Sequence, residues 1–522
     1  MINEWFSGRK TTALDNFVVG TVDQFLMIAL KQKHLTLRHL GFSKKVIVID
    51  EVHAYDVYMS QYLKRAISWA ASYNVPVIIL SATLLARKRI ELIECYLKGK
   101  GSKTNEIISS NIDLNTNSYP LVTYNDGNII KQFSDFEKKQ DKEIEVVRIE
   151  SEVIYEKVNE MSDSDGVIGI IVNTVKRAQE LAQNFIEQYG SDTVILLHSS
   201  FIAFERIRKE TELLNIIGKG KPRPDFKIVI GTQVIEQSLD ICFDVLFTDL
   251  CPIDLLIQRL GRLHRHNRVK PKMHEKPRVF VMGTNNKLDF EDGAKYVYGG
   301  YVLTRSQYFL PTVLKIPGDI SVLVQKVYSD ELEIDLPEEL LSIYENYKKD
   351  NELELKRKKR RAGTYLLNMP SYRERASMID WLRNSGETSW ENSEEQGNNQ
   401  VRDTQESIEV IALKEIGDGY GTFDDETDLS SSVLNNSVAK KLMKNTLRLP
   451  RNLTMHYNIE NTIKELEEFN NKYLSSWRQS PWLRGSLGII FDKDNVFRLN
   501  GYILRYNNRN GLTYERWSNG EI

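Results

Sequence analysis

Two carboxylates follow a strongly apolar segment early in the chain, in the stretch VIVIDEVHAYD (46–56). Asp50 and Glu51 come directly after the β-branched run, and His53 stands two residues further on. Carboxylate oxygens are ligands that Mg²⁺ prefers, and a second acid beside them can orient or deprotonate an attacking water. The stretch therefore predicts a magnesium-dependent site. Taken alone it also allows a simpler interpretation, a surface acid pair with His53 capping a helix.

A group of arginines in DLLIQRLGRLHRH (254–266) gives the strongest chemical signal. Arg259, Arg262 and Arg265 recur at every third position, so we expect their guanidinium groups to converge on one side of a helix or turn. Guanidinium groups so placed suit a triphosphate, because arginine can stabilise the charge of its transition state. A solvated basic face is the alternative, but such a face would not require the apolar turn that precedes the arginines.

Three weaker signals also follow apolar runs. Ser81 and Thr83 lie about 30 residues beyond the acid pair, in the tripeptide SAT. In the segment 231–244, Thr232 and Gln233 could hydrogen-bond a phosphate backbone, and Asp240 could reach a ribose hydroxyl. Each of these residues is by itself also a plausible helix cap or turn residue.

Short β-branched segments that end abruptly at polar residues alternate with helical patterns. Continuous apolarity is typical of strands buried on both faces, and the alternation predicts a doubly wound parallel α/β sheet. Such sheets bind ligands beyond the carboxyl ends of their strands, which is where the polar residues above would lie. The predicted strands are 16–21, 45–51, 75–83, 166–174, 193–199, 227–233 and 244–250, and the predicted helices are 56–73, 175–189 and 204–217.

The strands fall into two groups, so we expect two α/β domains and, at 522 residues, about three domains in all. The basic run 356–363 is either a solvated face or a nucleic-acid contact, and 384–400 is polar enough for a disordered loop. Short strand patterns return after residue 401. The predicted parts are a first domain with its connector (1–150), a second domain (151–300), a helical linker region with the polar loop (301–400) and a small α+β C-terminal domain (401–522).

Composition narrows the class of protein. Lys and Arg total 70 against 72 Asp and Glu, so any site for a polyanion must be a local patch rather than an effect of net charge. The three cysteines, Cys95, Cys242 and Cys251, have no CxxC spacing and are expected as reduced core residues. The N-terminus lacks the apolar stretch of a signal peptide, and no apolar run reaches the roughly 18 residues that span a bilayer. We therefore expect a cytoplasmic protein with no membrane partner.

Together the motifs resemble those of superfamily-two DExH helicases and, more narrowly, of the CRISPR-associated helicase-nucleases of type I systems. DEVHAYD, QRLGRLHRH and VGTVDQ are the specific marks, since generic DEAD or DEAH helicases do not share them. One departure is Ser200, where the family often has an arginine. The segments that carry the resemblance are 18–24, 50–56, 81–84, 172–179, 196–201, 204–210, 231–244, 258–266, 401–411 and 501–515.

The resemblance implies two RecA-like parallel-sheet domains, the first incomplete, followed by the helical linker and the small C-terminal domain. It also implies an ATP-dependent helicase that moves on single-stranded DNA in type I CRISPR antiviral defence, with ATP and Mg²⁺ as cofactors and the DNA-bound surveillance complex (Cascade) as partner. The implied catalytic residues are Asp50, Glu51, His53, Gln258, Arg262 and Arg265, with Asp50 and Glu51 serving the metal; Asp240, Arg259, Ser81 and Thr83 are implied at the nucleotide, and Thr21, Thr174, His198, Arg206, Thr232 and Gln233 at the DNA.

Two parts of that family are not found in this sequence. A GxxxxGK[ST] phosphate loop is absent, because Gly218-Lys219 and Gly220-Lys221 are not followed by Ser or Thr. A His-Asp doublet of the metal-dependent nuclease is also absent. We therefore expect a chain that begins midway through the first domain, needs the missing part in cis or in trans, and is inactive as an ATPase alone. Alternatives are a module that only binds nucleic acid or a partner, a different superfamily-two helicase, or a decayed product that does not fold.

Overall fold

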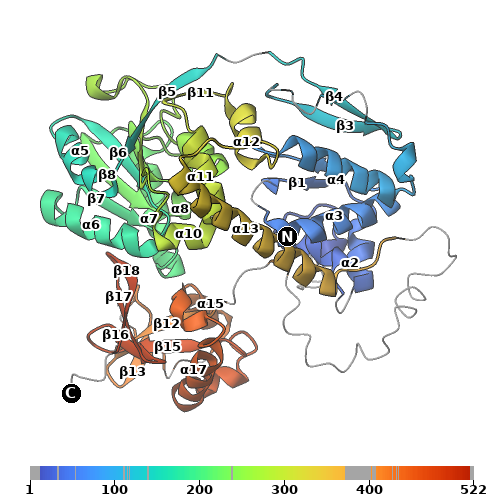
Figure 1. Ribbon diagram of the computed structural model, residues 1–522. Helices are drawn as coiled ribbons and strands as arrows, with labels where there is room; N and C mark the ends of the chain where they lie inside the picture. The colour runs from blue at the N-terminus through green and yellow to red at the C-terminus, as the bar shows by residue number, and fades with distance from the viewer. Residues whose placement is uncertain are drawn as a thin grey trace. The chain divides into compact units, whose positions relative to one another are not determined.

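The structure, a computed structural model, divides into two compact units (Figure 1). Unit 1 comprises the described residues up to 142 together with 300–309 and 315–402, and unit 2 comprises 143–299, 310–314 and 407–517. No helix in the described part of the chain is long and apolar enough to cross a membrane. The described residues are 12–31, 35–52, 55–109, 112–113, 116, 118–137, 140–236, 239–370, 401–402, 407–425, 427–430, 432 and 434–517.

Unit 1 is organised around the helix α3 (Val57–Ser72), whose buried face lies in the unit's hydrophobic core. The helix begins at Asp56, whose carboxylate caps it by accepting a hydrogen bond of 2.9 Å from the backbone N–H of Met59. The strands β1 (Ile47–Ile49) and β2 (Val77–Ile79) pair in parallel beside it. Both strands are confirmed, although they are shorter than the sequence predicts.

One face of the β1–β2 pair carries exposed apolar side chains. Val46 and Val48 are each 59% exposed, and Ile78 and Leu80 are 47% and 49% exposed. The prediction that these strands are buried on both faces is therefore wrong for this pair. The predicted strand 16–21 is also wrong, because the structure gives it no strand and leaves Phe17 and Val19 in solvent.

Later segments of the chain complete unit 1. The long helix α13 (Glu338–Tyr365) carries the basic run 356–363 on a largely exposed face and places Ala362 in the core, where Tyr62 donates to its carbonyl. The remaining elements are η2 (Thr12–Leu14), α1 (Val22–Leu26), η3 (Met27–Ala29), α2 (Leu35–Phe42), α4 (Ala86–Gly99), η5 (Thr104–Glu106), β3 (Val122–Asp126), β4 (Ile129–Phe133), α11 (Gly300–Phe309) and α12 (Ile320–Tyr328).

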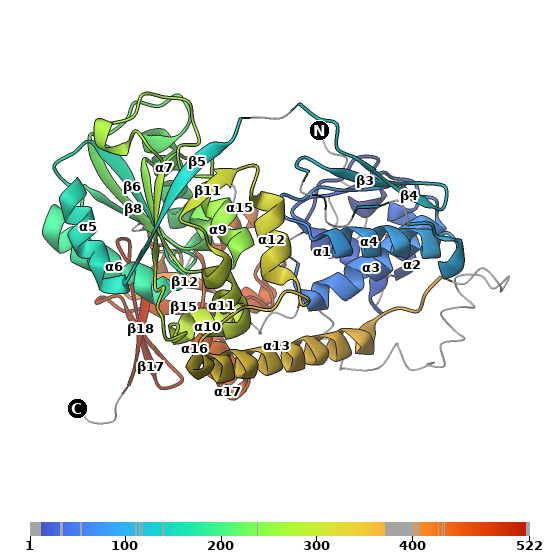
Figure 2. The ribbon, with the colours of Figure 1, turned by 45° about the horizontal axis from the view of Figure 1, so that its top comes forward.

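Unit 2 contains a sheet of seven described strands in the order β11-β5-β10-β9-β6-β8-β7, and every strand register that the structure gives within it is parallel. In Figure 2, α5 and α6 lie on one face of this sheet and α9 on the other, as right-handed crossovers require. Its strands are β5 (Lys142–Ile149), β6 (Gly166–Ile171), β7 (Val194–Leu197), β8 (Phe226–Gly231), β9 (Val245–Asp249), β10 (Arg278–Met282) and β11 (Val313–Ile316); its helices are η6 (Ser151–Val153), α5 (Ile154–Met161), α6 (Val175–Tyr189), α7 (Ala203–Ile217), α8 (Gln233–Glu236), α9 (Ile253–Leu260), η7 (Lys272–His274) and α10 (Asp292–Tyr298).

The sequence predicts the central strands of this sheet well and its edge less well. Gly166–Ile171, Phe226–Gly231 and Val245–Asp249 are almost wholly buried, as their continuous apolarity predicts. The predicted domain boundary at residue 150 is too late, because β5 pairs in parallel with β10 and so belongs to this second sheet.

The C-terminal part of unit 2 is a small α+β assembly that packs on the seven-stranded sheet domain. The backbone N–H of Leu512 donates to the carbonyl of Ser200 at 2.8 Å, and the Tyr506 hydroxyl accepts from the N–H of Ile202 at 3.2 Å. Its elements are β12 (Glu409–Ile416), β13 (Gly419–Gly421), α15 (Asn436–Met443), β14 (Thr446–Arg448), α16 (Arg451–Thr454), α17 (Ile459–Tyr473), η9 (Ser475–Gln479), β15 (Gly488–Phe491), β16 (Val496–Leu499), β17 (Tyr502–Asn507) and β18 (Gly511–Arg516).

Candidate functional site

The acid pair lies at the carboxyl end of β1, where both residues are exposed. Glu51 has a backbone φ of 56°, a left-handed conformation that few residues other than glycine adopt. The Asp50 carboxylate stabilises this turn by accepting a hydrogen bond of 2.9 Å from the N–H of Glu51, and the Tyr55 hydroxyl donates to the Asp50 carbonyl at 3.2 Å. The chain therefore presents two carboxylates beyond the strand end. His53 lies outside the described residues.

This pair fits a partial magnesium site. Mg²⁺ is commonly held by one or two carboxylates, with waters and substrate phosphates as its other ligands. No group of three or more His, Cys, Asp or Glu side chains suited to a metal occurs in the part of the chain that the structure describes. Asp50 and Glu51 would supply the protein oxygens, and waters and a bound phosphate the rest.

The other predicted residues of unit 1 lie on two segments. Ser81 and Thr83 follow β2, the strand that pairs with β1. Thr83 is 6% exposed, and its hydroxyl has no hydrogen-bond partner among the described atoms. Thr21 is exposed at the start of α1, where its carbonyl accepts from the N–H of Gln24 at 3.1 Å.

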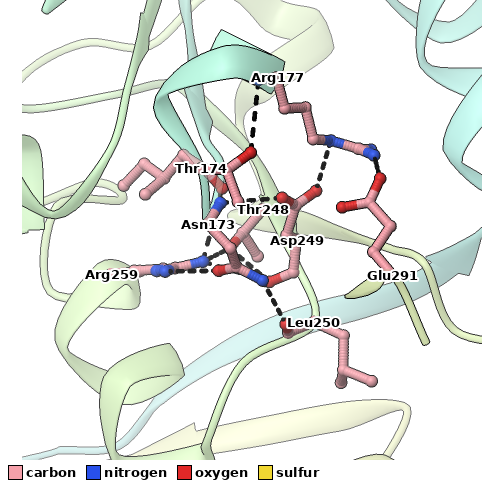
Figure 3. A network of polar contacts seen from close by, with 9 residues as sticks. Asn173, Thr174, Arg177, Thr248, Asp249, Leu250, Arg259 and Glu291 are labelled. Carbon is pink, nitrogen blue, oxygen red and sulfur yellow. Dashed lines mark hydrogen bonds and ion pairs between the residues drawn. The ribbon is translucent and has the colours of Figure 1, made fainter. Parts of the chain in front are cut away.

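Arg259 lies in a buried polar network at the carboxyl ends of β6 and β9 (Figure 3). It is 0% exposed and forms an ion pair of 2.6 Å with Glu236, which is buried as well. Its guanidinium also donates to the Thr248 hydroxyl at 2.7 Å and to the Asn173 side-chain oxygen at 3.1 Å. The prediction that Arg259 binds the nucleotide is therefore wrong, because its donors are used inside the fold.

Asp249 extends this network toward the surface. It accepts a hydrogen bond of 2.9 Å from the N–H of Asn173 and forms an ion pair of 3.1 Å with Arg177, which also pairs with Glu291 (Figure 3). Burial raises the pKa of Asp249 to about 6, although the adjacent Arg177 opposes the shift. None of these four residues was singled out from the sequence, since each is unremarkable in spacing and they converge only through the sheet.

Arg262 and Arg265 lie beyond the end of α9, so the three arginines do not share one helix face. Arg262 is 9% exposed and donates to the Glu236 carbonyl at 2.7 Å, whereas Arg265 is exposed and bonds the Asp240 carboxylate at 2.6 Å. His266 contacts the same carboxylate oxygen at 2.9 Å. Hydrogen bonds from His266 and Arg265 lower the pKa of Asp240, so this carboxylate stays ionised.

Gln258 completes the predicted catalytic set of unit 2. It lies on α9, one residue before the buried Arg259, and is half-buried. The structure thus brings Arg265 and Asp240 together, with Arg262 anchored nearby through Glu236.

The residues predicted to contact DNA are divided by burial. Gln233 is exposed at the start of α8, and Arg206 is 38% exposed on α7, where it lies 3.6 Å from Glu210. Thr174 caps α6 by accepting from the N–H of Arg177 at 3.3 Å. These three residues are accessible or partly accessible at or near the carboxyl edge of the sheet.

His198 and Thr232 are buried, which contradicts the prediction that their side chains contact DNA. They are 0% and 2% exposed, respectively. The His198 ring contacts the carbonyl of Asn510 through Nε2 at 3.1 Å and the N–H of Ser200 through Nδ1 at 3.2 Å. Burial lowers the pKa of His198 to about 3, so the ring is neutral at ordinary pH. Its role here is to hold the C-terminal segment against the sheet domain.

Parallel strand pairing in both units, an acid pair at a strand end and the exposed Arg265 after α9 are features of RecA-like helicase folds. Family models support a narrower assignment: residues 164–268 match "CRISPR-associated nuclease/helicase Cas3, C-terminal", and 402–512 match "Cas3 C-terminal domain". The whole chain is 55% identical to the CRISPR-associated nuclease/helicase Cas3 of Streptococcus thermophilus, and 92% of it is 30% identical to the Cas3 of Thermus thermophilus. The chain therefore belongs to the Cas3 family.

Solved structures agree with this assignment. The chain matches the crystal structure of T. fusca Cas3-AMPPNP with a TM-score of 0.82 and 25% identity, over 98% of this chain and 58% of that one. A crystal structure of a CRISPR-associated protein gives a TM-score of 0.82 at 28% identity, over 97% of this chain and 55% of that one. A CRISPR RNA-guided surveillance complex in a pre-nicking state gives 0.76 at 25% identity, over 97% and 61%. The chain spans 56% and 55% of the length of the two curated relatives.

Proposed function

We propose that this chain is the larger part of an ATP-dependent translocase on single-stranded DNA that acts in type I CRISPR interference. The observation that carries the proposal is the Asp50–Glu51 pair, held at the end of a parallel strand by an unusual backbone conformation in a chain of the Cas3 family. Left-handed backbone at a non-glycine residue costs about 1–3 kcal/mol and is typically retained where function requires it.

In this proposal Asp50 and Glu51 bind the metal and orient the attacking water, while Arg262 and Arg265 neutralise phosphate charge. Magnesium, when bound, would polarise the phosphate oxygens and offset their developing charge. Gln258 and Asp240 contact the nucleotide, and Ser81 and Thr83 connect hydrolysis with movement. Similarity to the crystal structure of T. fusca Cas3-AMPPNP supports a nucleotide role.

For DNA we propose that Thr21, Thr174, Arg206 and Gln233 contact the phosphates of the single strand. Their hydroxyl, guanidinium and amide groups are typical backbone donors, and Gln233 and Thr21 are exposed. The similarity to a chain of the surveillance complex supports docking of this protein on a DNA-bound complex of that kind.

We also propose that the 522-residue chain alone does not turn over ATP, because its sequence contains no GxxxxGK[ST] loop. A module that binds nucleic acid or a partner without hydrolysis is thus the second candidate function. The missing loop would be supplied by further polypeptide, in cis or in trans.

A chimera tests both candidates. The portion of Streptococcus thermophilus Cas3 that this chain does not cover is joined to residues 1–522, and ATP hydrolysis is measured with and without single-stranded DNA. We expect DNA-stimulated turnover in the chimera, none in the isolated chain, and a loss of about 10³-fold or more in the chimera with Asp50→Ala.

Three results separate the candidates. A folded chimera that binds DNA but hydrolyses nothing, beside an active parental Cas3, would leave the binding module as the function. Turnover by the isolated chain that Arg262→Ala abolishes would contradict its proposed inactivity. An unchanged rate in Asp50→Ala would contradict the role of the acid pair.

A further inference from the structure

Unit 2 contains a surface pocket of about 980 Å³ at the amino ends of its strands. Two segments supply most of its lining: residues 219–223, which lie between α7 and β8, and residues 265–269, which follow α9. The second segment reaches this edge because Leu263 pairs with Phe243, directly before β9 begins. The pocket is therefore on the opposite edge of the sheet from Gln233 and the other proposed DNA contacts.

The lining is strongly cationic in a protein whose formal net charge is only −2. A local concentration of one sign of charge raises the local concentration of ligands of the other sign. Asp240 is the one carboxylate among the lining residues, all of which the structure describes. The five cationic residues are Lys219, Lys221, Arg223, Arg265 and Arg268.

A buried carboxylate fixes one side of this pocket, and hydrogen bonds nearer the surface connect the residues of the other side. Arg223 donates through Nε to the wholly buried carboxylate of Asp244 at 2.8 Å and through a terminal nitrogen to the Cys242 carbonyl at 3.0 Å. On the other side, Arg268 bonds His266 at 2.9 Å, and His266 contacts Asp240 at 2.9 Å. Arg223 is thus held by buried groups, and Arg268 is held by a hydrogen bond to His266.

Lys219 and Lys221 differ from the other cations of the pocket. Both are exposed, and neither forms an ion pair with any residue that the structure describes. Arg223 and Arg265, by contrast, are paired with Asp244 and Asp240. The pocket therefore holds two ammonium groups whose charge no carboxylate of the described chain neutralises.

We propose that this pocket binds the phosphate chain of a nucleoside triphosphate, with Lys219 and Lys221 as contacts that lie outside the family's motifs. Lysine supplies compact point charges and arginine supplies forked donors, and together they recognise phosphate oxygens. The inference extends the proposed ATP-dependent function. It rests on that function only for the identification of the nucleoside part of the ligand. The lining itself accounts for recognition of the phosphates.

Equilibrium binding to the 522-residue chain tests the inference without requiring turnover. Titration calorimetry is run with ATP, with inorganic tripolyphosphate, with adenosine and with a 15-nucleotide oligo(dT), in low salt. We expect ATP and tripolyphosphate to bind and adenosine not to bind. In the double variant Lys219→Ala/Lys221→Ala, the Kd for both phosphate ligands should rise about tenfold, since each lost contact was an exposed charged one.

A matched control removes the same charge elsewhere on unit 2. Lys440 lies on α15 and Lys464 on α17, both are exposed, and neither lines the pocket. The variant Lys440→Ala/Lys464→Ala should bind ATP and tripolyphosphate as the parent does. Equal weakening in both double variants would reduce the effect to net charge and overturn the proposal. If the variant Lys219→Ala/Lys221→Ala bound the oligonucleotide more weakly but ATP as before, the proposal would also be overturned, and the pocket would be assigned to nucleic acid.

A second measurement remains valid if the pocket variant folds poorly. Limited lysine acylation of the parent chain, read by peptide mass spectrometry, should show that tripolyphosphate protects Lys219 and Lys221 and leaves Lys440 and Lys464 reactive. No protection at saturating tripolyphosphate overturns the proposal. The outcome is independent of the ATPase assay, because a chimera that is insensitive to Asp50→Ala would contradict the proposed function without affecting this protection.

Discussion

At the residue scale, Glu51 combines a chemical group with a backbone conformation that strands do not adopt. β1 ends at Ile49, and the φ of 56° at Glu51 turns the chain directly after Asp50, so the two acids do not continue the alternation of the strand. The hydrogen bond from the Glu51 N–H to the Asp50 carboxylate offsets part of the conformational cost. Sequence reasoning found the two acids from their position after an apolar run, but the backbone that presents them is visible only in the structure.

His198 allows a prediction about stability and pH. The neutral ring fits its surroundings, since Nε2 can donate to the Asn510 carbonyl while Nδ1 accepts from the Ser200 N–H. The lowered pKa, about 3, means that the folded protein does not take up this proton at pH 5, whereas an unfolded histidine with a pKa near 6.5 does. Stability from His198 is thus fully present above about pH 6.5 and is lost as the pH falls toward 3.

We therefore expect His198 to remove about 2 kcal/mol from the free energy of unfolding of unit 2 between pH 7.5 and pH 5. The variant His198→Gln keeps one donor and one acceptor without a titrating group, so it should lose about that much of the pH dependence. Chemical denaturation of both proteins at the two pH values measures this difference. Identical pH dependence in parent and variant would show that His198 is protonated in the folded state.

Arginine spacing illustrates what a sequence pattern does not reveal. A repeat of three residues predicts one shared face only if one helix contains all three arginines, and α9 ends at Leu260. Arg259 therefore points into the core toward Glu236, while Arg265 lies in solvent beside Asp240. The sequence signals identified the segment, and burial decided which arginine is available.

At the element scale, a strand is predicted more reliably from the sequence when other elements bury both of its faces. The central strands of the seven-stranded sheet in unit 2 are buried on both faces, so their apolar runs are continuous and easily recognised. Residues 16–21 have the same β-branched composition but pair with no described strand, so the local preference did not determine the outcome.

The exposed face of β1 and β2 leads to a prediction that compares adjacent positions on one strand. Val48 is 59% exposed and Ile47 is 7% exposed. Val48→Thr should change the free energy of unfolding by no more than about 0.5 kcal/mol, because surface substitutions usually have small effects. Ile47→Thr should cost about 2 kcal/mol, because it places a hydroxyl in the core of unit 1.

Urea denaturation of the two variants, together with binding of an apolar fluorescent dye, checks this contrast. Val48→Thr should also reduce dye binding, since it removes part of an exposed apolar patch. If Val48→Thr destabilised the protein as much as Ile47→Thr, the face would be covered in solution, contrary to the structure.

At the scale of the whole molecule, the two units have separate hydrophobic cores and should differ in stability. Unit 1 contains a parallel pair of two described strands with one apolar face in solvent, whereas unit 2 contains a sheet of seven described strands with a second, C-terminal core packed against it. The cores of unit 2 together bury more apolar residues than the core of unit 1, which stabilises unit 2. Local opening should therefore occur first in unit 1.

Ligand binding should increase the difference in stability between the two units, because every residue that lines the cationic pocket belongs to unit 2. A ligand that binds only the folded form stabilises it by about 2.7 kcal/mol at roughly 100 times its Kd. Native-state hydrogen exchange in the presence of tripolyphosphate should thus slow the amides of β6, β8 and β9 and leave those of β1 and α3 unchanged.

Hydrogen exchange measured without ligand shows which unit opens first. For exchange measured with tripolyphosphate, the variant Lys219→Ala/Lys221→Ala is the control. In that variant a fixed tripolyphosphate concentration should protect β8 and β9 less, while exchange in α3 stays as in the parent. Equal protection of both units by tripolyphosphate would mean that the phosphates are recognised outside the pocket or that the two units open as one. Protection confined to unit 2 and lost with the two lysines would show that this unit recognises phosphate by itself, before any contribution from the acid pair of β1.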